Sequence, residues 1–270
     1  MCSIFSSWDA LYTTELSNHD ANPTDEGTVW FDDSDAEQNL VRFFDEREQE
    51  QGQEQEGTGD GGHSEKDSLE HATAISAPTT KLKLERPATS FLDLGCGNGS
   101  LLVALREDGW EGSMLGVDYS ARSIQLAEDV ARSRFGGETV GVVRFKAWDV
   151  LRGEHAAVLG EAGQRDGWDV VLDKGTFDAI CLSDERDQDG KRVCEGYRDR
   201  VLECVRRGGL FVVTSCNWTE DELRGWFLGG GGHGVGRARF VEDGRIEYRA
   251  ISFGGVKGQT ISTLCFRKVC

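Results

Sequence analysis

Short apolar runs alternate with amphipathic segments between residues 88 and 270, a pattern typical of strands and helices that follow one another in an α/β sheet. Runs of strand length predict strands at 91–94, 114–118, 142–145, 168–172, 210–214, 248–253 and 260–266. Helical patterns predict helices after Gly99, from Ser120 to about Phe135, from about Lys191 to Val205, and after a capping box at Thr219 and Glu222. The alternation favours one sheet with helices on both faces.

Two stretches interrupt this pattern. Residues 45–70 carry ten acidic residues against two basic ones, a net charge of −8, and such a segment cannot bury a core. We therefore expect residues 45–87 to be an acidic disordered insertion and linker, and a solvated insertion is favoured over a docking arm. The glycine-rich loop 229–236 is expected to be flexible. These interruptions leave an N-terminal segment, 1–44, and one domain, 88–270.

Charge and composition narrow the possible partners. The formal charge is −18, and −10 remains without residues 45–70, which disfavours nucleic acid binding and would attract a basic protein. Neither a run of 18 apolar residues nor a basic-then-apolar N-terminus is present, so we expect a cytoplasmic protein that does not bind membranes. The eight cysteines include no Cys-x-x-Cys pair, which argues for reduced thiols and against a metal site. We expect a monomer.

The strand at 91–94 runs into a glycine turn, Asp93-Leu94-Gly95-Cys96-Gly97-Asn98-Gly99. Glycines at alternate positions let the backbone bend tightly and bring a ligand against main-chain N–H groups. The spacing is not the dinucleotide fingerprint G-x-G-x-x-G, and the Gly-Lys-Ser/Thr end of a phosphate loop is absent. The turn therefore predicts a different cofactor site, in which the Asp93 carboxylate suits a cationic group.

Acidic residues also follow the next two predicted strands. Asp118 ends the strand at 114–118, where a carboxylate can accept hydrogen bonds from both hydroxyls of a ribose. The alternative interpretation is that Asp118 caps the helix that starts at Ser120. The strand at 142–145 leads to Trp148-Asp149-Val150. Three strand ends thus carry residues suited to one ligand.

Together these motifs resemble those of class I S-adenosylmethionine-dependent methyltransferases, whose Rossmann-like sheet has seven strands with the last one antiparallel. The resemblance implies S-adenosyl-L-methionine as the cofactor, with the glycine turn at its methionine end, Asp118 at the ribose and Asp149 at the adenine. The implied cofactor-binding residues are Trp30, Asp93, Gly95, Cys96, Gly97, Asn98, Gly99, Asp118, Tyr119, Trp148, Asp149, Val150 and Asp173.

Further motifs narrow the resemblance. The strand at 168–172 leads to Asp173-Lys174-Gly175-Thr176-Phe177-Asp178, and the Asn/Asp-Pro-Pro-Tyr motif frequent in DNA and glutamine methyltransferases is absent there. This motif, Trp8-Asp9-Ala10-Leu11-Tyr12 and Thr214-Ser215-Cys216-Asn217-Trp218-Thr219 resemble the lysine methyltransferase family that modifies translation elongation factor 1-alpha. The resemblance spans about residues 8–44 and 88–268, while the acidic segment and the glycine-rich loop are insertions. It implies that segment 1–44 covers the cofactor and the substrate.

A lysine methyltransferase must align a neutral amine with the methyl group that it accepts, although the pKa of free lysine is about 10.4. Asp173 is our first choice to accept a hydrogen bond from that amine. A nearby carboxylate also raises the pKa of a lysine, so Asp173 suits a positioning role better than that of a base. Phe177 and Trp218 are expected to wall the alkyl chain and to contact the methylated ammonium through cation–π interactions.

Each of these roles has an alternative. Asp173 and Asp178 would then only cap the turn after the fourth strand, Phe177 would belong to the core, and Trp218 would staple the following helix. Trp30-Phe31 is expected to form a lid, and its alternative is a hydrophobic clasp on the core.

Three functional classes follow from these observations. They are a protein-lysine methyltransferase that acts on elongation factor 1-alpha, a methyltransferase for another protein or a small molecule, and a noncatalytic cofactor-binding partner. The last class would be expected to have lost acidic residues of the motifs, yet Asp93, Asp118, Asp149 and Asp173 are all present. An enzyme is therefore favoured.

Overall fold

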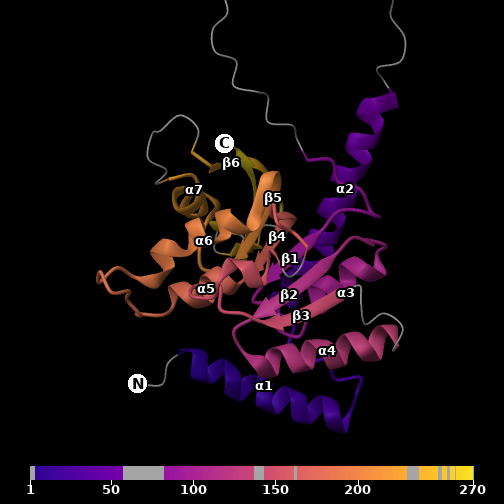
Figure 1. The fold of residues 1–270 in the computed structure, drawn as a ribbon, viewed down its shortest axis with the longest axis vertical. Helices are drawn as coiled ribbons and strands as arrows, with labels where there is room; N and C mark the ends of the chain where they lie inside the picture. Colours follow the sequence, from indigo (N-terminus) through magenta and orange to yellow (C-terminus); the bar gives the residue numbers. More distant parts are fainter. Residues whose placement is uncertain are drawn as a thin grey trace, which may run out of the picture.

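The computed structural model describes residues 4–56, 82–136, 143–160, 163–229, 237–248, 251–253, 256–258 and 260–269. A seven-stranded sheet forms the centre of the molecule, with helices on both sides of it (Figure 1). Its strands lie in the order β3-β2-β1-β4-β5-β9-β6, and β9 runs antiparallel to both of its neighbours. The expected α/β sheet with an antiparallel last strand is confirmed. The strands are β1 (Phe91–Leu94), β2 (Met114–Asp118), β3 (Val143–Ala147), β4 (Trp168–Lys174), β5 (Val205–Ser215), β6 (Arg239–Ile246) and β9 (Ser262–Val269).

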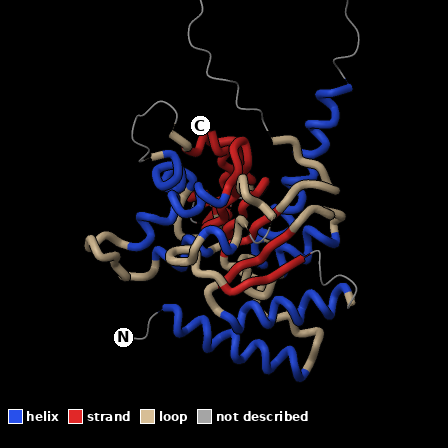
Figure 2. Tube along the Cα trace, viewed as in Figure 1, coloured by secondary structure: helices blue, strands red, loops and turns tan. Residues whose placement is uncertain are grey.

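Seven α-helices accompany the sheet in the described part of the chain. In Figure 2, α1 runs alongside α4 at the edge of the molecule near the N-terminus. The helices are α1 (Ile4–Ala21), α2 (Ala36–Glu56), α3 (Ser100–Glu107), α4 (Ala121–Phe135), α5 (Thr176–Cys181), α6 (Tyr197–Cys204) and α7 (Glu220–Leu228). The capping box predicted at Thr219 and Glu222 is present at the start of α7. None of the helices that the structure describes is both long and apolar enough to span a membrane.

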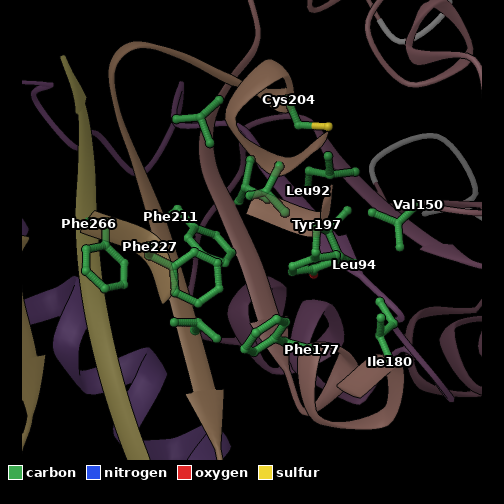
Figure 3. Close-up of a cluster of buried hydrophobic side chains, with 14 of the residues drawn as sticks. Leu92, Leu94, Val150, Phe177, Ile180, Tyr197, Cys204, Phe211, Phe227 and Phe266 are labelled. Carbon is green, nitrogen blue, oxygen red and sulfur yellow. The ribbon is translucent and has the colours of Figure 1, made fainter. Parts of the chain in front are cut away.

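Two hydrophobic clusters fill the space on either side of the sheet. Side chains alternate along a strand, so Leu92 and Leu94 face one cluster while Phe91 faces the other. The first cluster takes Phe177, Tyr197 and other residues of α5, α6 and α7, and Figure 3 shows it in close-up. The second packs α2 and α3 against the opposite face. The strands are buried on both faces. Their packing holds the carboxyl ends of β1, β2 and β4 together at one end of the sheet.

The strand order corrects the prediction for the last strands. The sixth strand of the sheet, β6, ends before the predicted 248–253, and Ile251–Phe253 instead forms β7, which pairs only with β8 (Val256–Gly258). Because β6 is an edge strand, only Phe240 and Ile246 of its residues are buried. Its weak hydrophobic pattern explains why the sequence did not predict it.

The first twelve residues of the predicted acidic insertion differ from expectation. Residues 45–56 continue helix α2 and are therefore helical, where the sequence predicted disorder. Glutamate, glutamine and arginine are good helix formers, and Phe44 anchors the helix in the core. Arg47 then binds Asp243, and the Gln51 side chain accepts a hydrogen bond from the Leu84 N–H at 2.8 Å. Residues 57–81 and the glycine-rich residues 230–236 lie outside the described part of the chain, so those predictions stay predictions.

Candidate active site

A cleft with a volume of about 930 Å³, including the open space at its mouth, lies at the carboxyl ends of β1, β2 and β4. The cleft brings together three strand ends, the start of α5 and aromatic side chains from the N-terminal segment. Its lining residues are Trp8, Tyr12, Thr28, Trp30, Gly95, Cys96, Gly97, Asn98, Val117, Asp118, Tyr119, Trp148, Asp149, Val150, Leu151, Lys174, Gly175, Thr176, Ala179 and Ile180.

The glycine turn forms the floor of the cleft. Gly95, Gly97 and Gly99 all have positive φ angles, between 56° and 78°, which strongly favour glycine. A Cβ atom on Gly95 would lie 2.0 Å from the Thr176 hydroxyl oxygen, and one on Gly97 would lie 3.1 Å from the Tyr12 hydroxyl. The turn therefore needs glycine both for its backbone shape and for the close approach of its neighbours.

Asp118 lies at the end of β2 and lines the cleft. Its carboxylate accepts hydrogen bonds from the Ser120 N–H at 2.9 Å and the Gly97 N–H at 3.3 Å, and burial raises its pKa to about 6. The Ser120 side chain, and not Asp118, is the N-cap of α4, because it accepts from the Ser123 N–H. Asp118 thus remains directed at the cleft, as a ribose ligand requires.

Aromatic side chains form one wall of the cleft. Helix α1 contributes Trp8 and Tyr12, and the Trp8 ring packs against Trp30 with centroids 4.8 Å apart. Phe31 turns away from the cleft, packs against the second core cluster, and has a φ of 63°. Trp30 faces the cleft, in the place expected for a lid. Phe31 packs against the core, as the alternative expected. On another side of the cleft, the Trp148 indole N–H donates to the Glu154 carbonyl at 3.1 Å.

Three predicted cofactor residues do not line the cleft. Gly99 is the N-cap residue of α3, directly behind the turn. Asp93 is 2% exposed, and burial raises its pKa to about 8, although the charge of Lys174 partly opposes that rise. Asp173 is 1% exposed. The two carboxylates thus lie behind the cleft surface.

Asp173 holds the start of α5 in place. Its carboxylate accepts from the Thr176 N–H at 2.8 Å, from the Phe177 N–H at 3.1 Å and from the Tyr197 hydroxyl. Burial raises its pKa to about 7, while these hydrogen bonds act in the opposite direction. Its neighbour Asp178 accepts from the Ser215 hydroxyl and from the Cys216 N–H. Asp173 thus makes the turn contacts that the alternative interpretation expected, whereas Asp178 binds the end of β5 and does not cap that turn.

The structure places Phe177 in the core, which was the alternative to a substrate wall. Figure 3 shows its ring beside Phe227 and Tyr197, with centroids 5.1 and 5.3 Å away, and the side chain is 1% exposed. Phe177 therefore leaves the set of residues that we propose to contact a substrate. Trp218 is partly buried in the loop between β5 and α7 and does not line the cleft. Its indole N–H is buried and has no hydrogen-bond partner among the described residues.

Several residues in or beside the cleft were not predicted from the sequence. Trp8 and Tyr12 are four residues apart, so both lie on one face of α1, and that spacing was a usable signal. Lys174 stands inside a motif that the sequence analysis singled out, but no role was assigned to it. Glu37 carried no signal, because only the fold brings it to within 3.3 Å of Lys174. No group of three or more His, Cys, Asp or Glu residues suited to hold a metal ion occurs in the described part of the chain.

The cleft fits S-adenosylmethionine. Asp118 lines the cleft at the end of β2, where folds of this kind bind a ribose, and the Cβ-free glycine turn lets main-chain N–H groups approach the ligand. Trp148, Val150 and Ile180 provide an apolar slot of the kind that an adenine ring needs. When bound, this cofactor supplies a methyl group on a positively charged sulfonium.

The strand order, the glycine turn after β1 and the acid at the end of β2 define a class I S-adenosylmethionine-dependent methyltransferase. The family described as a methyltransferase domain matches residues 85–237. The chain is 32% identical to "Protein-lysine N-methyltransferase EFM4" of Saccharomyces cerevisiae over 267 residues, which cover 97% of this chain and 92% of the yeast protein. It is 27% identical to "EEF1A lysine methyltransferase 2" of Homo sapiens over 262 residues, covering 97% and 84% of the two chains. The protein belongs to this family of protein-lysine N-methyltransferases.

Proposed function

We propose that this enzyme transfers a methyl group from S-adenosylmethionine to a lysine of translation elongation factor 1-alpha. The observation that carries the proposal is the similarity over 97% of the chain to relatives whose names state lysine methylation or this elongation factor. The cleft supports it, because it joins a cofactor floor to an aromatic wall. The net charge of −18 suits a basic protein substrate.

In this proposal the chain's own residues bind, shield and align. Asp118 and the glycine turn hold the cofactor, while Trp8 and Trp30 exclude water from one side of the cleft. An apolar environment lowers the pKa of a lysine amine, so entry between aromatic rings favours the neutral form that can attack a methyl group. Trp218 remains our candidate for a contact with the lysine chain.

Asp173 acts as a positioning residue in this scheme. Because α5 starts at Thr176 and contributes Ala179 and Ile180 to the cleft, the hydrogen bonds of Asp173 to this helix start help to set one cleft wall. That role needs no contact between Asp173 and the incoming amine. A monomer that works in the cytoplasm, where translation proceeds, completes the proposal.

The test is methyl transfer to purified, unmethylated elongation factor 1-alpha, with the modified residue located by peptide mass spectrometry. We expect a methyl group on a lysine with the wild-type enzyme and none with Asp118→Ala. Glu128→Gln changes an exposed acid of α4 and serves as the matched control that keeps activity. If wild-type enzyme binds S-adenosylhomocysteine but leaves the elongation factor unmodified, the cofactor assignment stands and the proposed substrate is overturned.

A further inference from the structure

Lys174 is the single lysine or arginine among the described residues that line the cleft. It ends β4, directly before Gly175, and its side chain is 12% exposed. Carboxylates lie around it, since Glu37 is 3.3 Å away and Asp93 lies close enough for the charge of Lys174 to oppose the rise in its pKa. A single cation in an acidic cleft can bind an anionic group, and its contacts indicate which one.

The contacts of Lys174 fix its ammonium group at the cleft surface. The ammonium donates to the Trp30 carbonyl at 3.2 Å and lies 3.3 Å from the Glu37 carboxylate. Glu37 is itself held by the Ser100 hydroxyl at 2.6 Å, at the first residue of α3. A lysine ammonium has three N–H donors, so these contacts leave one for a ligand.

The neighbouring turn indicates which ligand group that donor meets. Glu37 links Lys174 to Ser100 at the start of α3, and the Thr176 hydroxyl donates to the Leu94 carbonyl at 2.6 Å, so the ammonium stands at the side of the cleft that holds the glycine turn. The resemblance to class I methyltransferases implies that this side receives the methionine part of the cofactor, which carries both an ammonium and a carboxylate. A carboxylate in the same acidic cleft needs a cation.

We propose that Lys174 binds the methionine carboxylate of S-adenosylmethionine and that Glu37 positions Lys174 for this contact. The main alternative is that Lys174 only neutralises the buried acids around it. The proposal rests on the cofactor and is independent of the protein substrate, so binding experiments without elongation factor separate it from the proposed function.

The test compares two ligands on two proteins by calorimetry. S-adenosylhomocysteine keeps the carboxylate, whereas its decarboxylated analogue lacks it but retains the amine and the adenosine. We expect the wild type to prefer S-adenosylhomocysteine by about ten- to a hundredfold, the size of one charge-assisted hydrogen bond. We expect Lys174→Met to bind both ligands equally, and Lys174→Arg to keep a preference.

Control variants separate this contact from a general effect on the cleft. Asp118→Asn alters the ribose site that both ligands share, so it should weaken both equally and keep their ratio. Glu37→Gln keeps the shape of the side chain but removes its charge, and it should reduce the preference only in part. Far-UV circular dichroism checks that each variant folds.

Two results would overturn the proposal. One is equal affinity of the wild type for the two ligands, a result that does not depend on any variant. The other is a folded Lys174→Met that retains the wild-type preference, because the carboxylate would then be bound elsewhere and Lys174 would serve only the buried acids.

Discussion

The carboxylates at the carboxyl ends of β2 and β4 have different surroundings. After β2, Asp118 lines the cleft and is 6% exposed, so a ligand there can reach it, although it also accepts hydrogen bonds from the Ser120 and Gly97 N–H groups. After β4, Asp173 and Asp178 are each at most 2% exposed and accept hydrogen bonds from within the protein. An acid after a strand therefore predicts where a carboxylate lies but not whether a ligand can reach it.

The buried acids after β4 connect neighbouring elements. Asp178 binds Ser215 and Cys216, so it ties α5 to the end of β5. Asp173 ties the start of α5 to Tyr197, the first residue of α6. The motif that looked catalytic in the sequence thus joins three elements next to the cleft, which supports the positioning role that we propose for Asp173.

The largest expected effect tests the carboxylate that lines the cleft. Asp118→Ala removes a carboxylate that can accept from two ribose hydroxyls, and we expect the affinity for S-adenosylhomocysteine to fall about a hundredfold, or about 3 kcal/mol. Isothermal titration calorimetry measures this loss, with Glu128→Gln as the control. An affinity within about twofold of the wild type would remove Asp118 from the cofactor site and with it the contrast between the two strand ends.

The next effect tests the buried carboxylate after β4. Tyr197→Phe removes the hydroxyl that donates to Asp173 and leaves a buried carboxylate oxygen short of a donor. We expect the free energy of unfolding to fall by about 1 to 3 kcal/mol, while cofactor affinity stays within about twofold. Urea unfolding and calorimetry measure the two quantities. Asp173→Asn should behave in the same way, and a variant that unfolds like the wild type yet loses methyl transfer would make Asp173 a catalytic residue.

Buried acids also predict how stability depends on pH. Burial raises the pKa of Asp93 to about 8 and that of Asp173 to about 7, against about 3.9 for an aspartate in an unfolded chain. The folded state therefore binds more protons than the unfolded state, and stability is lost as pH rises from about 4 to about 8. Each such group contributes a slope of at most about 1.4 kcal/mol per pH unit within its window.

Asp93→Asn isolates this effect, because the amide does not titrate. In the absence of cofactor, we expect the variant to lose less stability than the wild type between pH 5 and pH 8 by roughly one group's share of the slope. Urea unfolding at several pH values measures it. Equal slopes for the two proteins would show that Asp93 is already ionised in the folded state.

The cofactor half of the site was predictable because its chemistry is local in sequence. The turn from Gly95 to Gly99 requires glycine at fixed spacing, and Asp118 ends an apolar strand, so a short segment reveals each part. Ten of the thirteen predicted cofactor residues line the cleft, and the other three lie directly behind it. The single sheet followed from the alternation of apolar runs and helices, and its antiparallel last strand from the resemblance to class I methyltransferases.

The remaining errors share a physical cause. Burial of Phe177 depends on rings from α6 and α7, and the edge strand β6 depends on pairing with β9. Helix α2 persists past residue 44 because Arg47 reaches Asp243, almost two hundred residues further along the chain. Such long-range contacts leave no periodic signal in the sequence, so only the fold reveals them.

The smallest expected effect concerns Trp218, which lies in the loop that Asp178 holds. Its buried indole N–H lacks a partner among the described residues, and its ring packs against Trp226 with centroids 5.6 Å apart. If Trp218 contacts the lysine chain, Trp218→Phe keeps a ring but weakens the cation–π contact by about 0.5 to 1 kcal/mol, which raises the KM for elongation factor 1-alpha about two- to fivefold. Cofactor affinity should not change. Trp226→Phe is the matched control. An equal rise in KM for both variants would assign Trp218 to the packing of the loop. The side chains after β4 and after β5 would then all have structural roles.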